Sequence, residues 1–352
     1  MSQYWTDLVH QLDPYTPGEQ PQDQQYVKLN TNENPYPPSP KVIEAINAYD
    51  KARLKLYPDP ESTALRRALA ERFDVTAENV FLGNGSDEVL AHSFQAFFKR
   101  QQPLLFPDIS YSFYPVYCGL YQIEYQTIPL DSDFNITIDD YPKENGGIIF
   151  PNPNAPTSKL LPLVAIEQLC RQHSHSVIIV DEAYIDFGGD SAIPLTRQYP
   201  NLLVIQTFSK SRSLAGLRLG YAIGHADLIE GLNRIKNSFN SYPIDAIAQT
   251  AALASLADDD YFRQHCQAII DTRDNMTAQL SELGFSVLPS AANFVFAQHQ
   301  SESAEHLYRA LKQRGVLVRY FNKPRIDNYL RITVGTGEEC EHLLDALKSL
   351  LA

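Results

Sequence analysis

Apolar and polar residues follow two different rhythms along this chain. Amphipathic segments with helical spacing occupy residues 41–52 and 61–73. Short β-branched or apolar runs recur between helical stretches, at residues 79–84, 103–107, 123–130, 146–153, 176–184, 202–210 and 220–224. Strands that alternate with helices predict an α/β fold with a mostly parallel, doubly wound sheet covered on both faces. Ligands on such sheets bind at the carboxyl ends of the strands, so the polar residues that end these runs are the candidates for chemistry.

The rhythm changes in the last third of the chain. A long helical stretch at 248–284 is followed by segments typical of strand, helix, strand, strand and helix, at residues 285–298, 303–315, 316–321, 329–336 and 338–352. We therefore predict a large domain over residues 41–240 and a smaller C-terminal α/β domain over residues 241–352. Residues 1–40 are rich in Pro, Gln and Asn, which disfavour a regular helix or a central strand. We expect an extended arm there, packed on the small domain or on a partner subunit.

Charge and composition exclude several classes of function. The 42 acidic residues outweigh the 29 Lys and Arg, and a net charge of −13 opposes binding to nucleic acid. No run approaches the roughly 20 apolar residues of a membrane span, and the first residues lack a signal peptide, so we expect a cytoplasmic protein. The four cysteines are widely spaced without a CxxC pair, and His173 and His175 precede a strand far from the other motifs, so we expect neither disulfides nor a metal site.

Two of the apolar runs end in residues suited to catalysis. The run at 176–184 ends in Asp181, Glu182 and Tyr184, although strand-end Asp residues more often form turns or caps. The next run delivers Ser209 and Lys210 to a polar loop. A single lysine is usually a solvated surface group, but one held in a partly buried site loses proton affinity, and a neutral amine can attack an aldehyde.

A phosphate site is indicated by two segments together. Arg218 lies eight residues beyond Lys210 and supplies a forked cation, and Ser209 supplies a hydroxyl donor. Gly85 and Ser86 allow close backbone approach, and a helix that begins near Asp87 presents free amide hydrogens. A GNGSDE turn alone is weak evidence, because many strand-to-helix turns have this composition.

Seven motifs in order resemble a known enzyme family. They are LNTNENPYPPSP, LYPDP with a following ALR, GNGSDE, PNPNAPTS, VDEAYIDF, TFSKSRSLAGLRLGYAIG and YLRITVGT. Together they resemble the fold-type I pyridoxal-phosphate-dependent aminotransferases of class II, and in particular the histidinol-phosphate aminotransferases. Their number, order and spacing make the resemblance specific, and it runs nearly from end to end.

The resemblance implies a role for each cofactor residue. Lys210 would be the Schiff-base lysine for pyridoxal 5′-phosphate, and Asp181 would pair with the pyridine nitrogen. Tyr184 and Asn154 would bond the phenolic oxygen of the cofactor, and Tyr111 would stack on its ring unless it is only a core aromatic. The phosphate would be held by Gly85, Ser86, Asp87, Ser209 and Arg218.

Other residues would bind the substrate or complete the site from a second subunit. Arg331 matches the arginine that binds a substrate carboxylate, the alternative being an ordinary surface ion pair, and Arg319 could assist it. Tyr15 and Asn30 match positions that line the substrate pocket. Tyr57 matches a tyrosine that reaches the cofactor phosphate of the neighbouring subunit, which implies a homodimer.

The implied reaction is transamination of L-histidinol phosphate with 2-oxoglutarate, a step of histidine biosynthesis. A broad aromatic aminotransferase and a threonine-phosphate decarboxylase are alternatives on the same scaffold. A non-catalytic, cofactor-binding regulator is an alternative from another class, although no DNA-binding helix-turn-helix is evident. The chain departs from the family pattern at Ser158, where glycine is frequent, and at Arg212, for which the sequence alone offers no physical role.

Overall fold

The computed structural model describes residues 2–352, and its central sheet contains one strand for each of the seven predicted apolar runs. The strands are β2 (Val80–Asn84), β3 (Leu104–Pro107), β4 (Tyr125–Ile128), β5 (Gly147–Pro151), β6 (Ile178–Asp181), β7 (Leu202–Thr207) and β8 (Leu219–Gly224). Their order is β2-β8-β7-β6-β5-β3-β4, and only β8 runs antiparallel to its neighbours. The prediction of a mostly parallel α/β sheet is confirmed.

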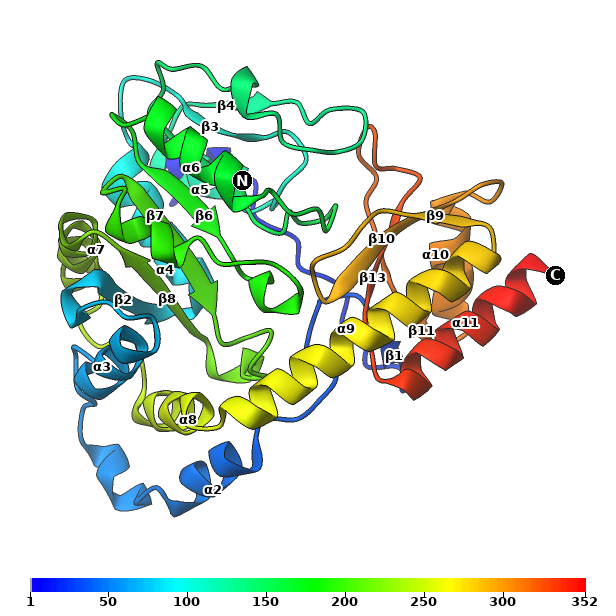
Figure 1. Ribbon diagram of the computed structural model, residues 1–352, viewed down its shortest axis with the longest axis horizontal. Coiled ribbons are helices and arrows are strands. Elements are labelled where there is room, and N and C mark those ends of the chain that lie inside the picture. Colours follow the sequence, from blue (N-terminus) through cyan, green and yellow to red (C-terminus); the bar gives the residue numbers. More distant parts are fainter. Residues whose placement is uncertain (1) are drawn as a thin grey trace.

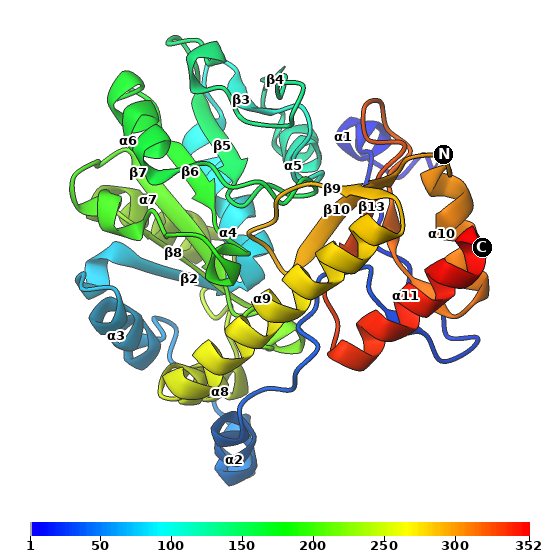
Figure 2. The ribbon, with the colours of Figure 1, turned by 45° about the vertical axis from the view of Figure 1, so that its right-hand side comes forward.

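Helices cover both faces of this sheet (Figures 1 and 2). They are α2 (Pro40–Ala48), α3 (Thr63–Arg72), α4 (Gly85–Ser93), α5 (Tyr114–Tyr121), α6 (Leu163–Gln172), α7 (Ala226–Phe239) and α8 (Ala246–Leu256). Ile149 of β5 joins the apolar cluster under α4, α5 and α7, whereas its neighbour Phe150 joins the cluster under α3, α6 and α8. Every residue of β5, β6 and β7 is buried, which explains why these runs read as continuously apolar.

A second, antiparallel sheet lies beside the first. Its order is β12-β13-β10-β9, made of β9 (Phe285–Val287), β10 (Phe294–His299), β12 (Arg319–Tyr320) and β13 (Leu330–Thr333). The helices α10 (Ala304–Gln313) and α11 (Gly337–Leu351) complete this lobe. Two segments that we predicted as single strands are each divided. Residues 285–298 form the hairpin of β9 and β10, and residues 316–321 contribute to both β11 (Val316–Leu317) and β12 because those two strands pair with different partners.

The long helical stretch is also divided, into α8 and α9 (Asp259–Glu282). The break falls at Ala257 and Asp258, and Asp258 leaves helical geometry with φ −122° and ψ 63°. The carboxylate of Asp258 accepts hydrogen bonds from Ser39 and Lys41 at the start of α2. Helix α8 packs on α2 and α3, whereas α9 runs beneath the second sheet (Figure 1). We propose that the domain boundary lies at this break, slightly later than the residue 241 predicted from the sequence.

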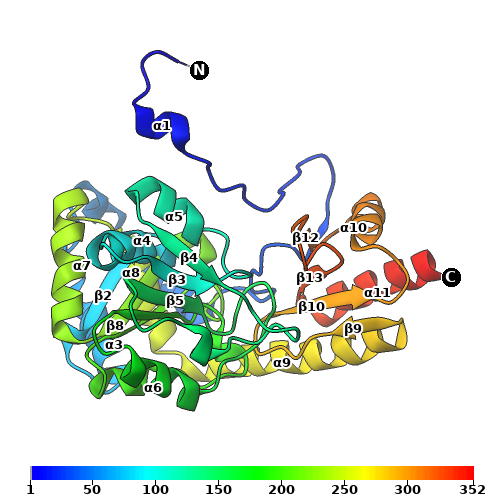
Figure 3. The same ribbon diagram turned by 90° about the horizontal axis from the view of Figure 1, so that it is seen from above.

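The first forty residues form the arm that their composition predicts, with two local exceptions. A five-residue helix, α1 (Asp7–Gln11), precedes the proline-rich run, so our expectation of no regular helix there was wrong for that turn. The strand β1 (Val27–Lys28) pairs in parallel with β11, which fastens the arm to the second lobe. Figure 3 shows α1 standing away from both sheets.

Shorter helical turns fill the connections. They are η1 (Lys51–Lys55), η2 (Ala77–Asn79), the π-helical η3 (Phe94–Phe98), η4 (Ile138–Asp140), η5 (Ile185–Phe187), η6 (Ile193–Arg197) and η7 (Ala215–Leu217). All four cysteines are buried free thiols. Across residues 2–352, no helix combines the length and apolar character that crossing a membrane requires.

Candidate active site

The carboxyl ends of the central strands open into a cavity of about 440 Å³ between the two sheets. This volume is within the range of small-molecule sites. Of the residues singled out from the sequence, those that line the cavity are Tyr15, Asn30, Ser86, Asp87, Tyr111, Asp181, Tyr184, Ser209, Lys210, Arg218, Arg319 and Arg331. Residues from the arm, the large sheet and the small sheet therefore meet at one place.

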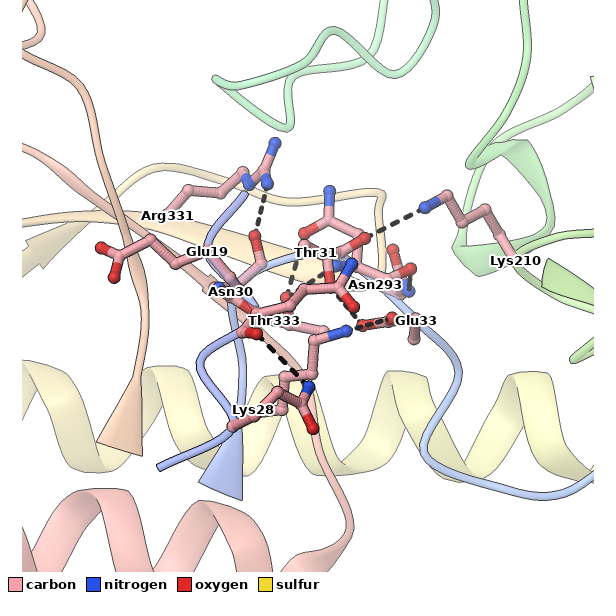
Figure 4. A network of polar contacts seen from close by, with 12 residues as sticks. Glu19, Lys28, Asn30, Thr31, Glu33, Lys210, Asn293, Arg331 and Thr333 are labelled. Carbon is pink, nitrogen blue, oxygen red and sulfur yellow. Dashed lines mark hydrogen bonds and ion pairs between the residues drawn. The ribbon is translucent and has the colours of Figure 1, made fainter. Parts of the chain in front are cut away.

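Lys210 follows the end of β7 and projects toward the arm. Its Nζ donates a hydrogen bond of 3.2 Å to the carbonyl oxygen of Thr31, as Figure 4 shows. The same nitrogen lies 5.6 Å from the centre of the Tyr184 ring. The lysine is thus held at the wall of the cavity by a neutral acceptor, with no carboxylate among its hydrogen-bond partners in residues 2–352.

Asp181 ends β6 and is 5% exposed. Its Oδ2 accepts a hydrogen bond of 3.2 Å from the Tyr114 hydroxyl, and its Oδ1 accepts one of 3.3 Å from the backbone of Ala183. Burial raises the pKa of Asp181 to about 7, against the opposing effect of these hydrogen bonds and of the Lys210 charge. A buried carboxyl that is only marginally ionised is suited to pairing with a cation inside the cavity.

The start of α4 forms a cradle with Arg218. Gly85 has φ +79°, a conformation that favours glycine, and a Cβ there would lie 2.6 Å from Arg218 Nη2, so a larger residue would also displace the Arg218 guanidinium. Arg218 Nη1 contacts Ser209 Oγ at 3.5 Å, and Nη2 donates to Asp87 Oδ2 at 2.9 Å. Free amide hydrogens at the helix start and the guanidinium together provide the donors that a phosphate group binds.

The aromatic and amide residues predicted to contact the cofactor ring differ in their placement. Tyr111 lines the cavity and donates to Asp87 Oδ1 at 3.1 Å, and burial raises its pKa well above the ordinary value. The Tyr184 hydroxyl accepts a hydrogen bond of 3.1 Å from Asn32. Asn154 is 2% exposed, and its Nδ2 donates to Ile109 O and Thr157 Oγ1, both at 2.9 Å. Its Oδ1 has no hydrogen-bond partner in the described chain.

Arg331 enters the cavity from β13, on the second sheet. Its Nη2 donates to Asn30 O at 2.9 Å, and its guanidinium lies over the rings of Phe294 (5.4 Å) and Phe321 (5.6 Å). Its Nε is buried without a partner among residues 2–352. Burial lowers the pKa of this guanidinium, and the nearby Arg319 acts in the same direction. Unmet donors on a desolvated cation favour binding of an anion.

The arm closes this end of the cavity. Tyr15 packs its ring on Phe113 with centroids 4.7 Å apart. Asn30 donates from Nδ2 to Glu19 O at 2.8 Å, and its Oδ1 is buried without a partner in the described part of the chain. Figure 4 shows Arg331 and Lys210 reaching the same short stretch of the arm from opposite sides.

Tyr57 is the predicted site residue that the fold does not bring to the others. It is 82% exposed on the loop after η1 and stacks on Tyr242 at 4.7 Å. It does not line the cavity of its own chain.

Sequence reasoning missed several cavity contacts. Tyr114, which donates to Asp181, lies three residues after Tyr111, but twenty tyrosines in the chain gave no reason to select it. Arg325 binds Asp108 across the two lobes at 3.0 Å, and both residues line the cavity. No local pattern could reveal this pair, because it depends on how the second sheet is placed against the first.

Known proteins are similar in sequence to this chain along nearly its whole length. Histidinol-phosphate aminotransferase 1 of Hydrogenovibrio crunogenus is 60% identical, with 100% of this chain and 99% of the relative covered. Histidinol-phosphate aminotransferase 2 of Dechloromonas aromatica is 59% identical, with 99% of each chain covered. These relatives confirm the resemblance on which the sequence interpretation was based.

Solved structures share the fold. The histidinol-phosphate aminotransferase of Sinorhizobium meliloti, in complex with pyridoxal-5′-phosphate, superposes with a TM-score of 0.89 at 22% identity, covering 99% of each chain. The L-threonine-O-3-phosphate decarboxylase of Porphyromonas gingivalis superposes with a TM-score of 0.80 at 22% identity, covering 92% of this chain and 99% of that one. The family model described as aminotransferase class I and II matches residues 24–347. This chain therefore belongs to the aminotransferase class I and II family.

Proposed function

We propose that this chain is a pyridoxal-phosphate-dependent aminotransferase that converts L-histidinol phosphate and 2-oxoglutarate to imidazole acetol phosphate and glutamate. The relatives named above, about 60% identical from end to end, support this activity. The observation that carries the proposal is that Lys210 and Arg331, from two different sheets, line one cavity. An amine for chemistry and a desolvated cation for anion binding are thereby combined in one site.

The residues present fit the cofactor at both of its ends. The cradle of Gly85, Ser86, Ser209 and Arg218 is suited to its phosphate, because the helix start and the guanidinium both favour an anion. Asp181 is suited to its ring nitrogen, because a buried carboxyl with a pKa near 7 is stabilised as the carboxylate by a neighbouring cation. When bound, pyridoxal phosphate supplies an aldehyde that reacts with amines and a ring that withdraws electrons from the substrate carbon.

The chain's own residues then perform binding and proton transfer. Nζ of Lys210 would hold the cofactor covalently and, once the amino donor has released it, would act as the base that accepts the proton of the substrate's amine-bearing carbon. The carboxylate of Asp181 would keep the ring nitrogen protonated. Tyr184, fixed by Asn32 at 3.1 Å, and Asn154 are the proposed partners of the cofactor's phenolic oxygen.

One pocket has to accept two unlike substrates in turn. The donor carries a phosphate, and 2-oxoglutarate carries a carboxylate in its place. Arg331 has a buried Nε with no partner in the described residues, and Arg319 lies beside it at the cavity wall. Guanidinium groups bind either anion through paired hydrogen bonds, so the same two residues serve both half-reactions. Tyr15 and Asn30 of the arm are proposed to close the pocket around the substrate.

A homodimer accounts for the position of Tyr57. Tyr57 is 82% exposed and stacks on the exposed Tyr242, and Leu54 and Leu56 just before it are each 59% exposed. An exposed group of large apolar side chains is typical of an interaction surface. We propose that Tyr57 completes the phosphate site of a partner subunit, and that the enzyme acts in the cytoplasm.

Related activities remain as alternatives on this scaffold. A threonine-phosphate decarboxylase has the same fold, and fold alone does not select between the activities. Release of carbon dioxide without consumption of an oxo acid would identify the decarboxylase. A cofactor-binding regulator would bind the donor without releasing a keto product.

The visible absorbance of the purified protein with its cofactor tests the substrate directly. We expect histidinol phosphate to bleach the band of the Lys210-bound cofactor rapidly, and 2-oxoglutarate to restore it. Phenylalanine at the same concentration serves as the control and should bleach the band slowly. Equal bleaching by both would replace the proposal with a broad aromatic aminotransferase, and absence of a band after addition of cofactor would refute the proposed cofactor.

Replacement of Arg331 by Ala should weaken both half-reactions. We expect kcat/KM for histidinol phosphate and for 2-oxoglutarate to fall roughly 10- to 100-fold, as for loss of a charged hydrogen bond worth about 1.5–3 kcal/mol. Arg314→Ala is the matched control, because Arg314 is exposed and, among residues 2–352, its side chain donates a hydrogen bond only to Ala310 O at the end of its own helix. Stopped-flow measurement of each half-reaction provides the test, and unchanged turnover of 2-oxoglutarate or glutamate would contradict the assigned role.

Asp181 should impose a pH dependence on the stability of the ligand-free protein. The unfolded carboxyl has a pKa of 3.8 and the folded one about 7, so folding favours the protonated form. This contribution is fully present below about pH 4 and is lost as the pH rises through about 7. Asp181→Asn removes it, so the melting temperature of the variant relative to wild type should rise between about pH 4 and about pH 7. A difference that stays constant with pH would show that Asp181 is not protonated in the folded state.

Hybrid dimers test the placement of Tyr57. If Tyr57 acts across subunits, mixing inactive Lys210→Ala with a Tyr57→Ala chain leaves one intact site per hybrid, and activity should recover. Lys210→Ala mixed with Asp181→Asn is the control, because both residues belong to the site of their own chain and no recovery is expected. Activity measured after co-refolding each pair decides the question, and absence of recovery in the first pair would place Tyr57 in the site of its own chain or outside it.

A further inference from the structure

Arg212 is a buried arginine that the proposed reaction does not use. It lies two residues after Lys210, and its side chain is 6% exposed. Burying a guanidinium is costly unless hydrogen bonds and an opposite charge compensate for the lost water. Its contacts therefore indicate what the segment after the lysine is attached to.

Most partners of Arg212 lie at the end of α8 or at the start of α9. One further partner, Phe208, directly follows β7. Its Nη1 donates to the backbone oxygen of Ser255 at 2.8 Å and to Ser255 Oγ at 3.3 Å. Its Nη2 lies 3.7 Å from Asp259 Oδ1, and its guanidinium covers the Phe262 ring at 4.1 Å. The guanidinium carbon also lies 5.9 Å from the centre of the Phe208 ring, just before the lysine loop. The guanidinium is held by its plane as well as its charge, which a lysine could not reproduce.

Two more contacts fix the same segment from other directions. Ser211 donates from its hydroxyl to Asp186, in the turn after β6. Asn34 of the arm donates from Nδ2 to the backbone oxygens of Lys210 (3.0 Å) and Ser211 (3.3 Å). Residues 210–212 are thus attached to the arm, to the Asp181 loop and to the start of α9.

Helix α9 carries this attachment into the second lobe. It contains 24 residues, about 36 Å at about 1.5 Å per residue. At its far end it packs against β9 and α11, and Arg273 in its middle donates to the backbone oxygens of Phe187 (2.7 Å) and Ala292 (3.1 Å). Figures 1 and 2 show the helix running from the base of the large sheet to the edge of the small one. If α9 moves as a rigid rod with the small sheet, a tilt of that sheet also moves the end that Arg212 holds.

We propose that Arg212 is a positioning residue that ties the Lys210 segment to α9, so that the orientation of the small lobe with Arg331 is coupled to the position of the lysine amine. This inference rests on the proposed function. It predicts that Lys210 is correctly placed only when Arg212 keeps its contacts at the start of α9. Loss of Arg212 should disturb the chemistry at Lys210 even though Arg212 itself contacts neither substrate nor cofactor.

The chain provides a matched control in Arg72. Arg72 also binds Asp259 and also lies over Phe262, at 5.5 Å, but it belongs to α3, and the partners of its hydrogen bond and ring contacts, Asp259, Phe73 and Phe262, all lie outside the lysine loop. Both replacements remove contacts to the same carboxylate and the same ring, but Arg212 is more buried (side chain 6% exposed, against 27% for Arg72) and also bonds Ser255, so its loss costs more overall stability. A positioning role is therefore identified by where the disturbance falls: in the lysine loop when Arg212 is replaced, and not there when Arg72 is replaced.

Hydrogen exchange of the ligand-free protein tests the coupling without the cofactor. We expect Arg212→Met to speed exchange of the amides in residues 208–214 by about tenfold or more, because the segment loses one of its three attachments. Arg72→Met should leave those amides unchanged. Equal exchange in the two variants would overturn the inference, whatever the cofactor or substrate is.

The loaded enzyme provides the second readout. We expect Arg212→Met to shift the pH midpoint of the visible band of the Lys210-bound cofactor and to lower kcat roughly 10- to 100-fold, the effect of misplacing a reacting group by about 1 Å. KM should change less than kcat. Arg212→Lys, which keeps the charge but not the fork, should give an intermediate shift and serves if the Met variant does not fold. A wild-type spectrum and kcat in Arg212→Lys would overturn the inference, whereas a wild-type protein with no cofactor band would refute only the proposed function.

Discussion

The site depends on the register of three parallel strands. Pro151 of β5 lies opposite Asp181 of β6, which lies opposite Ile205 of β7. Because the backbones are paired in this way, the strands end at one edge and their following residues are delivered to the same space. All three strands are buried on both faces, so a one-residue register shift would exchange the side chains packed in the two apolar clusters and would move Asp181 away from the lysine loop.

The second requirement is that two sheets share one cavity. The large sheet supplies Lys210, Asp181 and the cradle at the start of α4, and the small sheet supplies Arg319 and Arg331, which line the same cavity. The arm lies between them, with Thr31 O accepting from Lys210 and Asn30 O accepting from Arg331. Helix α9 is a second connection between the two lobes, since it contacts α8 and η5 as well as β9 and β10. An enzyme that must hold two different substrates in succession benefits from walls that can move together.

The sequence predicted the large sheet well, because most of its strands are buried apolar runs flanked by polar residues; the edge strand β4 is the exception, with three of its four residues exposed. It predicted the small sheet less well, since β9, β11 and β12 have only two or three residues each and their partners are distant in sequence. The candidate site residues were chosen from the polar ends of the apolar runs and from the family resemblance, and twelve of these candidates line the cavity. Contacts such as Tyr114 with Asp181 or Arg325 with Asp108 depend on tertiary packing, which leaves no periodic trace. Arg212 is the sharpest example, because only the structure reveals the ring and the carboxylate that hold it.

The position of the arm has a consequence for the order in which this protein is made. Asn30 and Arg331 are 301 residues apart in the chain, and β1 pairs with Val316 and Leu317 of β11. Contacts of such long separation form late, because the entropy of closing so large a loop is paid before any stabilisation is gained. The arm is synthesised well before β11, so β1 has no strand to pair with until residues 316 and 317 have been made. A nascent chain that has not yet reached β11 and β13 therefore lacks Arg331 and the attachment of the arm, so the pocket is completed after the large sheet and its lysine loop.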